Sequence, residues 1–494
     1  MLFNSAAFLV FFPAVTLLYF VLPRRVRPLW LLIASYYFYM SWNPVYALLI
    51  LFSTLVTWLS GLGLARASEK GAAPGVRKLM VAASFVLNLS ILFWFKYANF
   101  AIDLLNGLFG IAHVSVTLPA LDILLPVGIS FYTFQALSYT VDVYRGKLAA
   151  ERSLLSYALY VSFFPQLVAG PIERSGHLLA QLKEPKPFSY ERARDGLLLM
   201  LWGYFLKLVL ADRIALFVDA VYGDINGYGG WYLIVATMLF AVQIYCDFMG
   251  YSTIAVGAAR ILGVELMENF DAPYLSGSVA EFWRRWHISL TSWFRDYLYI
   301  PLGGSRKGRL RKYVNTMIVF LVSGLWHGAD LTFVIWGGLN GAFQVIGDLL
   351  KPVKKHLADR VGLRPGRFCN RLLRGVITFL LVDFTWLFFR AADLKEAWSV
   401  LRSIALVHNP WILLDGSLLT VGMDAPNFFL MLAAIGVLLA ADICRRRGVC
   451  IRERIQRQDG WFRAVFIALV IVFLLQFGVW GAAYNEASFI YFQF

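Results

Sequence analysis

The chain has 494 residues, of which 60% are hydrophobic and only 15% are charged. Soluble proteins usually carry about 25% charged residues, so this composition excludes an ordinary cytosolic enzyme and predicts an integral membrane protein, because a lipid-facing surface cannot be charged. In a soluble protein the net charge of +15 would suggest nucleic-acid binding. Here the basic residues gather between apolar runs, as in the loops of membrane proteins, so we expect membrane lipid and no nucleic acid as a partner.

Apolar runs in chain order predict an all-α protein, a polytopic bundle of about 11–12 transmembrane helices, because about 20 apolar residues span the hydrocarbon core. The first run has no basic segment before it, so we expect a transmembrane helix and not a cleavable signal peptide. We expect crossings near residues 6–22, 29–41, 45–65, 79–99, 121–141, 196–222, 231–257, 313–326, 331–350, 375–390, 425–444 and 461–481.

The charges of the loops predict the orientation of the bundle. With successive loops on alternate sides, one side carries 38 Lys and Arg residues and the other carries only Lys395 and Arg402. Basic loops stay in the cytoplasm, so we expect the N-terminus on the outer side. We expect a single transmembrane domain over residues 1–494, made of N-terminal helices (1–150), a core (151–350) and C-terminal helices (351–494).

Several kinds of catalytic site have no support in the sequence. It contains no phosphate-binding loop, no dinucleotide fingerprint, no HExxH zinc motif and no GxSxG serine motif. The four cysteines lack metal-ligand spacing, so we expect no metal site.

Two stretches do not resemble simple crossings. In residues 161–174, proline and glycine interrupt an apolar run, which predicts a re-entrant or interfacial segment buried in protein. If residues 280–303 form one helix, a polar stripe lies opposite an aromatic face, and the stripe consists of Arg284, His287, Thr291 and Arg295. Such a helix either lines a cavity or anchors the chain at the lipid interface.

Two of the six histidines are candidate catalytic residues. His287 lies in the polar stripe, and His327 follows a short apolar run and the aromatic residue Trp326. An ionisable group at membrane depth is costly, which favours a functional role, although a histidine bonded to a backbone carbonyl is equally consistent with the pattern. The other four histidines lie in predicted loops.

A second polar stripe lies on the expected helix 231–257, where Gln243, Asp247 and Tyr251 share one face. An unpaired aspartate is expensive in a bilayer, so Asp247 should face the protein interior. Interhelical hydrogen bonding explains this stripe as well as a cavity does.

Five segments together resemble the membrane-bound O-acyltransferase (MBOAT) family. They are FFPQLVAGPIERSGHLLAQL (163–182), QIYCDFMGYSTIAVGAARILG (243–263), FWRRWHISLTSWFRDYLYIPLGGSR (282–306), SGLWHGADLTFVIWGGLNG (323–341) and FIYFQF (489–494). The likeness spans nearly the whole chain and is greatest to the branch of alginate O-acetyltransferase type. It implies an MBOAT-like fold with cytoplasmic and periplasmic funnels that meet near the histidines.

The resemblance also implies an activity. Members of this branch move an acetyl group from cytoplasmic acetyl-CoA across the bacterial inner membrane to an exported polysaccharide, commonly through a periplasmic partner of the SGNH-hydrolase type. The family's essential histidine corresponds to His327 and its second active-site histidine to His287. Arg284, Arg295 and Arg306 could hold the phosphates of coenzyme A, although lipid headgroups attract arginine equally well.

Two other functions stay open at this point. A transporter or flippase of an acylated carrier would use the polar stripes as a path, but we find no internal repeat of the kind that many transporters show. Within the family, the acyl group could instead be D-alanyl, transferred to a cell-wall polymer.

Overall fold

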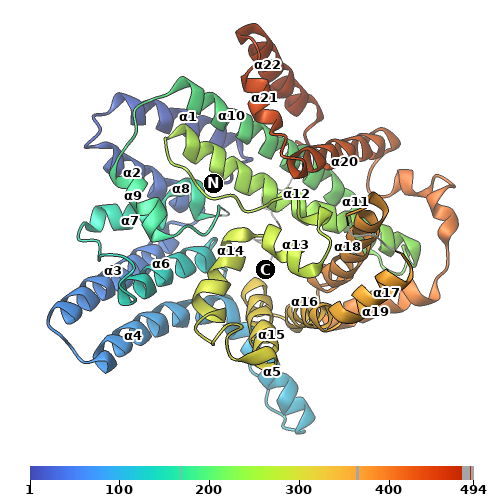
Figure 1. Ribbon diagram of the computed structural model, residues 1–494, viewed down its shortest axis with the longest axis horizontal. Coiled ribbons are helices and arrows are strands. Elements are labelled where there is room, and N and C mark those ends of the chain that lie inside the picture. Colours follow the sequence, from blue (N-terminus) through green and yellow to red (C-terminus); the bar gives the residue numbers. More distant parts are fainter. Residues whose placement is uncertain (169, 363–365, 481–489, 491–494) are drawn as a thin grey trace. The chain divides into compact units, whose positions relative to one another are not determined.

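The computed structural model describes residues 1–168, 170–362, 366–480 and 490, and all regular structure in that part of the chain is helical (Figure 1). The chain forms two compact units. Unit 1 holds residues 1–200 and 252–267, and unit 2 holds residues 201–251 and 268–494. Two helices contribute to both units, namely α10 (Tyr190–Tyr204) and α12 (Trp231–Ile261).

Unit 1 contains the N-terminal helices. In chain order they are α1 (Ala6–Val21), α2 (Arg27–Met40), η1 (Pro44–Tyr46), α3 (Ala47–Glu69), α4 (Pro74–Leu92), η2 (Phe93–Tyr97), α5 (Ala98–Ile111), α6 (Ile129–Tyr144), α7 (Leu154–Ser162), α8 (Phe164–Leu167) and α9 (Ser175–Lys183). Polar side chains join some of them. Gln135 of α6 donates from Nε2 to the carbonyl oxygen of Tyr160 on α7, at 2.6 Å.

Unit 2 contains both candidate histidines. Its other elements are η3 (Phe205–Ala211), α11 (Asp212–Gly223), η4 (Pro273–Leu275), α13 (Val279–Arg285), α14 (Ile288–Phe294), η5 (Arg295–Tyr299), α15 (Gly308–His327), α16 (Leu331–Leu349), α17 (Lys351–Arg360), α18 (Phe368–Arg390), α19 (Leu394–Leu406), η6 (Pro410–Leu413), η7 (Ser417–Thr420), α20 (Ala425–Arg446), α21 (Ile451–Gln456) and α22 (Gly460–Phe477).

Among the described residues, six helical segments are long and apolar enough to cross a membrane. They are Pro44–Glu69, Pro74–Ile111, Trp231–Ile261, Phe368–Arg390, Ala425–Arg446 and Gly460–Phe477. Five of them contain one of the twelve expected crossings, and Gly460–Phe477 overlaps the crossing expected at 461–481. The bent pair α16–α17, with an angle of 55°, passes the same test as one segment. The expectation of a multi-pass, all-helical membrane protein is therefore confirmed.

Two expected helices differ in the structure. The crossing expected at 121–141 begins as a helix only at Ile129, because Pro126 disfavours helical backbone before it and Gly128 is left-handed, with φ of 75°. In 161–174, the single turn α8 follows α7, and residue 169 of that segment lies outside the described residues. A re-entrant role for this segment stays a prediction.

The prediction of one continuous helix over 280–303 is wrong. The helix ends at Arg285 and restarts at Ile288, because His287 adopts a left-handed backbone with φ of 44° and ψ of 55°. The change of direction breaks the polar stripe, so His287 no longer shares a helix face with Arg284. His287 is buried, whereas Arg284 and Arg295 are exposed.

Helices α15 and α16 pack against each other at backbone distance. A Cβ atom on Gly324 of α15 would overlap the carbonyl oxygen of Phe333, and one on Gly337 of α16 would overlap that of Phe320. The connection between the helices is short, and Asp330 caps α16 by accepting from the backbone N–H of Thr332 at 2.7 Å. These glycines hold the end of α15, with His327, against α16.

We therefore expect Gly324→Ala to destabilise the protein by about 1–3 kcal/mol, because the added methyl group must push two helix backbones apart. The thermal unfolding of the purified protein in detergent would measure the loss. Gly347→Ala on α16 is the matched control, since a Cβ atom there meets nothing within 4 Å. Helix propensity predicts that this control is neutral or more stable than the wild type. Equal transition temperatures for the two variants would contradict this account of the packing.

Candidate active site

Three aromatic rings in unit 2 pack around His327. It is the last residue of α15 and is 4% exposed. Its ring centroid lies 4.9 Å from that of Trp326, 5.0 Å from that of Trp336 and 5.5 Å from that of Phe389. All three rings stand nearly perpendicular to the imidazole. Residues from α15, α16 and α18 thus place one imidazole within an apolar, water-poor surrounding.

His287 occupies the break between α13 and α14. A left-handed backbone is uncommon for a residue other than glycine, so the neighbouring structure must hold it in place. The segment before α13 does so through Asn269. Its carbonyl oxygen accepts from the N–H of Ile288 at 2.9 Å, and its side-chain oxygen accepts from the N–H of Ser289 at 3.3 Å. The His287 side chain is consequently fixed and 1% exposed.

Trp326 brings the two histidines to one site. Its ring centroid lies 6.1 Å from that of His287 and 4.9 Å from that of His327. Phe248 of α12 also packs against His287, with ring centroids 4.6 Å apart. The two histidines, 40 positions apart in the sequence, therefore both lie beside one indole ring in unit 2.

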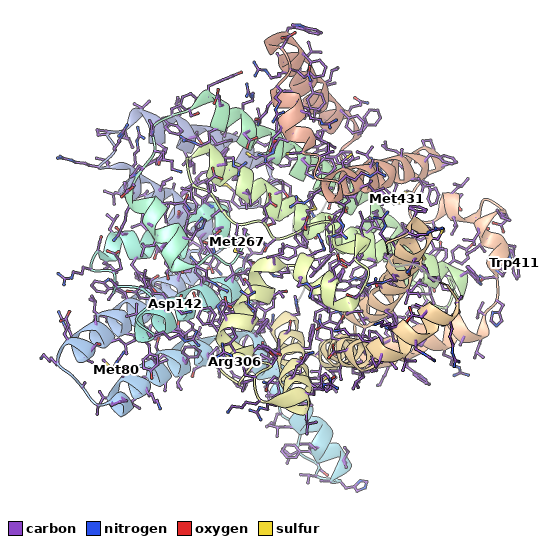
Figure 2. All side chains as sticks on the ribbon, viewed as in Figure 1. Met80, Asp142, Met267, Arg306, Trp411 and Met431 are labelled. Carbon is purple, nitrogen blue, oxygen red and sulfur yellow. The ribbon has the colours of Figure 1, made fainter. Side chains whose placement is uncertain are left out.

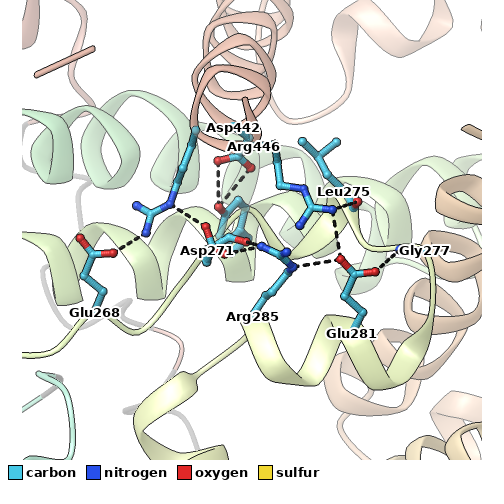
Figure 3. Close-up of polar contacts among 10 residues, drawn as sticks. Glu268, Asp271, Leu275, Gly277, Glu281, Arg285, Asp442 and Arg446 are labelled. Atoms are coloured by element: carbon cyan, nitrogen blue, oxygen red, sulfur yellow. Dashed lines mark hydrogen bonds and ion pairs between the residues drawn. The ribbon is translucent and has the colours of Figure 1, made fainter. Parts of the chain in front are cut away.

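An ion-pair network fixes the segment around His287 (Figure 3). Arg285 pairs with Asp271 and, at 3.1 Å, with Glu281, and the backbone N–H of Asp271 donates to the Arg285 carbonyl oxygen at 3.0 Å. Two arginines at the end of α20 complete the network. Arg445 pairs with Asp271 at 2.9 Å, and Arg446 pairs with Glu281 at 3.0 Å. The turn at His287 is thus tied to α20.

Asp247 is paired, as its position in the sequence predicts. Lys207 Nζ lies 2.7 Å from Asp247 Oδ1 and 2.8 Å from Asp212 Oδ1, and all three side chains are buried. The backbone N–H of Ile490 donates to Asp247 Oδ2 at 2.8 Å. Asp247 directly precedes Phe248, so this cluster supports the helix that covers His287. Gln243, one turn earlier on α12, is also buried.

The predicted donor-binding residues do not gather around the histidines. Arg284 and Arg295 are exposed, and Arg306 is exposed on the loop between η5 and α15 (Figure 2). Arg295 pairs with Asp296 at 3.0 Å. Thr291 lies on the first turn of α14, where its backbone N–H donates to the His287 carbonyl oxygen at 2.9 Å. The structure therefore separates a buried pair of histidines from an exposed basic surface.

Burial changes the ionisation of His287, which lies outside the six candidate membrane spans. Desolvation lowers the pKa of His287 from 6.5 to about 3. The imidazole is therefore neutral at physiological pH and keeps one donor and one acceptor nitrogen. Such a ring can position a carbonyl group or pass a proton, but it carries no charge.

Sequence reasoning missed the residues that enclose the histidines. Phe248, Trp336 and Phe389 lie in apolar runs, where an aromatic residue facing lipid has the same pattern as one facing a site. Asn269 lies in a loop without any motif. Among the described residues, no group of three or more His, Cys, Asp or Glu side chains is placed to hold a metal ion.

Comparison with known proteins identifies a family whose matched region includes the candidate site. The model of the membrane-bound O-acyltransferase family matches residues 147–356, which include both histidines. The probable alginate O-acetylase AlgI of Pseudomonas aeruginosa is 38% identical over 82% of this chain and 75% of its own length. The peptidoglycan O-acetyltransferase of Helicobacter pylori is 32% identical over 82% of this chain and 80% of its own length.

A less similar relative is named for a different activity, D-alanyl transfer. The teichoic acid D-alanyltransferase of Bacillus subtilis is 25% identical over 53% of this chain and 68% of its own length. The family resemblance of the sequence is therefore confirmed, and with it the expectation of an enzyme. The chain belongs to the membrane-bound O-acyltransferase family and is an O-acyltransferase of the membrane.

Proposed function

We propose that this protein moves an acetyl group from cytoplasmic acetyl-CoA across the bacterial inner membrane for the O-acetylation of an exported, alginate-like polysaccharide. A periplasmic acetyltransferase of the SGNH type then makes the final ester. The observation that carries the proposal is the pair of buried histidines that both lie beside Trp326. Relatives named for O-acetylation of alginate and of peptidoglycan support acetyl as the acyl group and a sugar polymer as the final acceptor.

His327 acts as the general base in this proposal. An acceptor hydroxyl gives its proton to the imidazole while its oxygen attacks the thioester carbonyl. The carbon–sulfur bond then breaks, and the imidazolium returns the proton to the thiolate of coenzyme A, so protons balance over the step. Positioned general-base catalysis is typically worth about 10²–10⁴-fold in rate.

His287 has a different role because it stays neutral. Its imidazole positions the thioester or relays the proton beside Trp326, while Asp247 and Gln243 on α12 support the helix that carries Phe248. The exposed arginines Arg284, Arg295 and Arg306 hold the phosphates of the donor with charge-assisted hydrogen bonds, and Thr291 supports the turn between them and His287.

The topology supports entry of the donor from the cytoplasm. All three arginines belong to the predicted basic loop 258–312, on the side that carries 38 of the loop Lys and Arg residues. The same bias supports an inner-membrane location with a periplasmic N-terminus. The acyl group therefore enters at the basic side and leaves towards the opposite compartment.

Acetyl transfer has more support than D-alanyl transfer. The alginate O-acetylases of three further Pseudomonas species, P. putida, P. syringae and P. fluorescens, are 36–39% identical over 80% of the chain. The teichoic acid D-alanyltransferases of Bacillus subtilis and Streptococcus thermophilus are 25% and 28% identical over 53% and 55% of it.

Replacement of His327 tests the proposed function. We expect His327→Ala and His327→Gln to lower acetyl transfer by at least about 10²-fold, because the general base is lost. The assay follows release of coenzyme A from labelled acetyl-CoA in proteoliposomes, together with acetylation of the exported polymer in cells. His356→Ala is the matched control, since His356 is exposed on α17.

Three results would overturn parts of the proposal. Wild-type transfer by both His327 variants would exclude this histidine as the base. Binding of an acylated carrier protein without binding of acetyl-CoA would favour D-alanyl transfer. Movement of an acylated carrier without any release of coenzyme A would favour a transporter.

The low pKa of His287 predicts a pH-dependent stability. In the unfolded chain a histidine takes up its proton near pH 6.5, whereas folded His287 resists protonation down to about pH 3. The unfolded state therefore binds more protons in this window, and stability present above pH 6.5 is lost as the pH falls. Between pH 7.5 and 5.0 we expect a loss of about 2 kcal/mol from this residue.

His287→Asn measures that contribution, because asparagine tolerates a left-handed backbone and does not titrate. The free energy of unfolding in detergent micelles, compared between variant and wild type at pH 7.5 and 5.0, isolates His287 from every other group. A difference that does not change with pH would show that His287 is protonated as readily in the folded protein as in the unfolded one.

A further inference from the structure

Two hydrogen-bond donors on one face of α16 have no acceptor in the described part of the chain. They are the hydroxyl group of Thr332 and the indole N–H of Trp336. Both side chains are 0% exposed. They are four residues apart and therefore share one face of the helix. An unpaired donor in an interior without water is costly, so its retention calls for an acceptor that is absent from the folded chain itself.

Comparable groups beside them are satisfied. The indole N–H of Trp283, which also packs against Trp336, donates to Asn340 Oδ1 at 3.1 Å. Asn340 in turn donates to the carbonyl oxygen of Trp336 at 2.9 Å and to the Thr385 hydroxyl at 3.2 Å. On α15, the Thr316 hydroxyl donates to the Lys312 carbonyl oxygen at 2.9 Å. The hydroxyl group of Thr332 and the indole N–H of Trp336 thus differ from the donors of Trp283, Asn340 and Thr316.

Their position relates them to the candidate general base. The Trp336 ring stands at 81° to the His327 ring, with centroids 5.0 Å apart. The close packing of α15 and α16 at Gly324 and Gly337 fixes this arrangement. Trp336, on the face of α16 that carries both donors, therefore lies beside the imidazole.

We propose that Trp336 and Thr332 form the oxyanion hole of this acyltransferase. When the acceptor oxygen attacks the thioester carbonyl, the carbonyl oxygen becomes an oxyanion, which the indole N–H and the threonine hydroxyl receive. The carbon–sulfur bond then breaks, the carbonyl re-forms, and His327 returns the acceptor's proton to the thiolate. The inference rests on the proposed acyl transfer at His327, and it makes Trp336 and Thr332 catalytic residues.

Donors of this kind act mainly in the transition state, where the negative charge develops. Loss of one oxyanion donor typically lowers kcat by about 10²–10³-fold. The ground-state carbonyl is a weaker acceptor, so KM for acetyl-CoA should change little. A purely structural role for these residues would instead lower stability and leave kcat per folded enzyme unchanged.

The experiment removes each donor while keeping the shape of its side chain. Trp336→3-benzothienylalanine replaces the N–H by sulfur, and Thr332→Val replaces the hydroxyl by a methyl group. In proteoliposomes with labelled acetyl-CoA we expect kcat for release of coenzyme A to fall by roughly 10²-fold for each, with KM within a few-fold of wild type. Trp283→3-benzothienylalanine and Thr316→Val are the matched controls, whose donors already have acceptors.

The outcomes separate this inference from the proposed function. Unchanged kcat in both donor variants, with His327→Ala inactive, would overturn the oxyanion hole and leave the acyl transfer intact. Full activity of His327→Ala would remove the proposed function itself. A fall in kcat for the Trp283 control as large as that for Trp336 would show that the effect comes from packing, and would also overturn the inference.

Discussion

The contact between α15 and α16 at Gly324 and Gly337 is the constraint on which the candidate site depends. Two helix backbones that touch leave no room for a side chain at the crossing, so the residues on either side of it are held in a fixed relation. His327 follows the crossing on one helix, and Trp336 precedes Gly337 on the other. The position of His327 relative to the Trp336 ring thus follows from backbone packing and not from flexible side chains.

The second histidine depends on a different kind of support. The left-handed backbone at His287 costs conformational free energy because the residue is not glycine. Hydrogen bonds accepted by Asn269 and ion pairs of Arg285 must stabilise it. Strain held by the surrounding structure is common where a side chain must point in one direction. The Trp326 ring contacts both imidazoles and therefore connects the helix packing at His327 with the stabilised turn at His287.

The class of fold could be predicted from the sequence, for physical reasons, whereas the roles of the candidate site residues stay predictions. Long apolar runs and one-sided loop charge can be read without coordinates, since the bilayer imposes them directly. Asp247 was expected to face the interior, and it pairs with Lys207. The family motifs pointed to His287, His327 and Trp326 as candidate site residues, and their rings lie close together.

The remainder depended on tertiary structure. Neither Trp286 nor His287 marks a helix break by its residue type, so the turn at His287 was mistaken for continuous helix. Trp336 and Phe389 resemble lipid-facing residues in a linear pattern, and only packing shows that they face an imidazole. The exposed arginines were expected on one face with His287, which the break at that residue prevents.

The pairing of α20 with the segment before His287 has a consequence for biogenesis. Arg446 and Glu281 are 165 positions apart, and Arg445 and Asp271 are 174 apart. When a ribosome has just synthesised the segment with His327, it has not yet synthesised Arg445 and Arg446, whose ion pairs stabilise the segment before His287. The nascent chain therefore cannot complete the ion pairs around its candidate site during early translation, and the site is fully supported only after one of the last membrane segments has been synthesised.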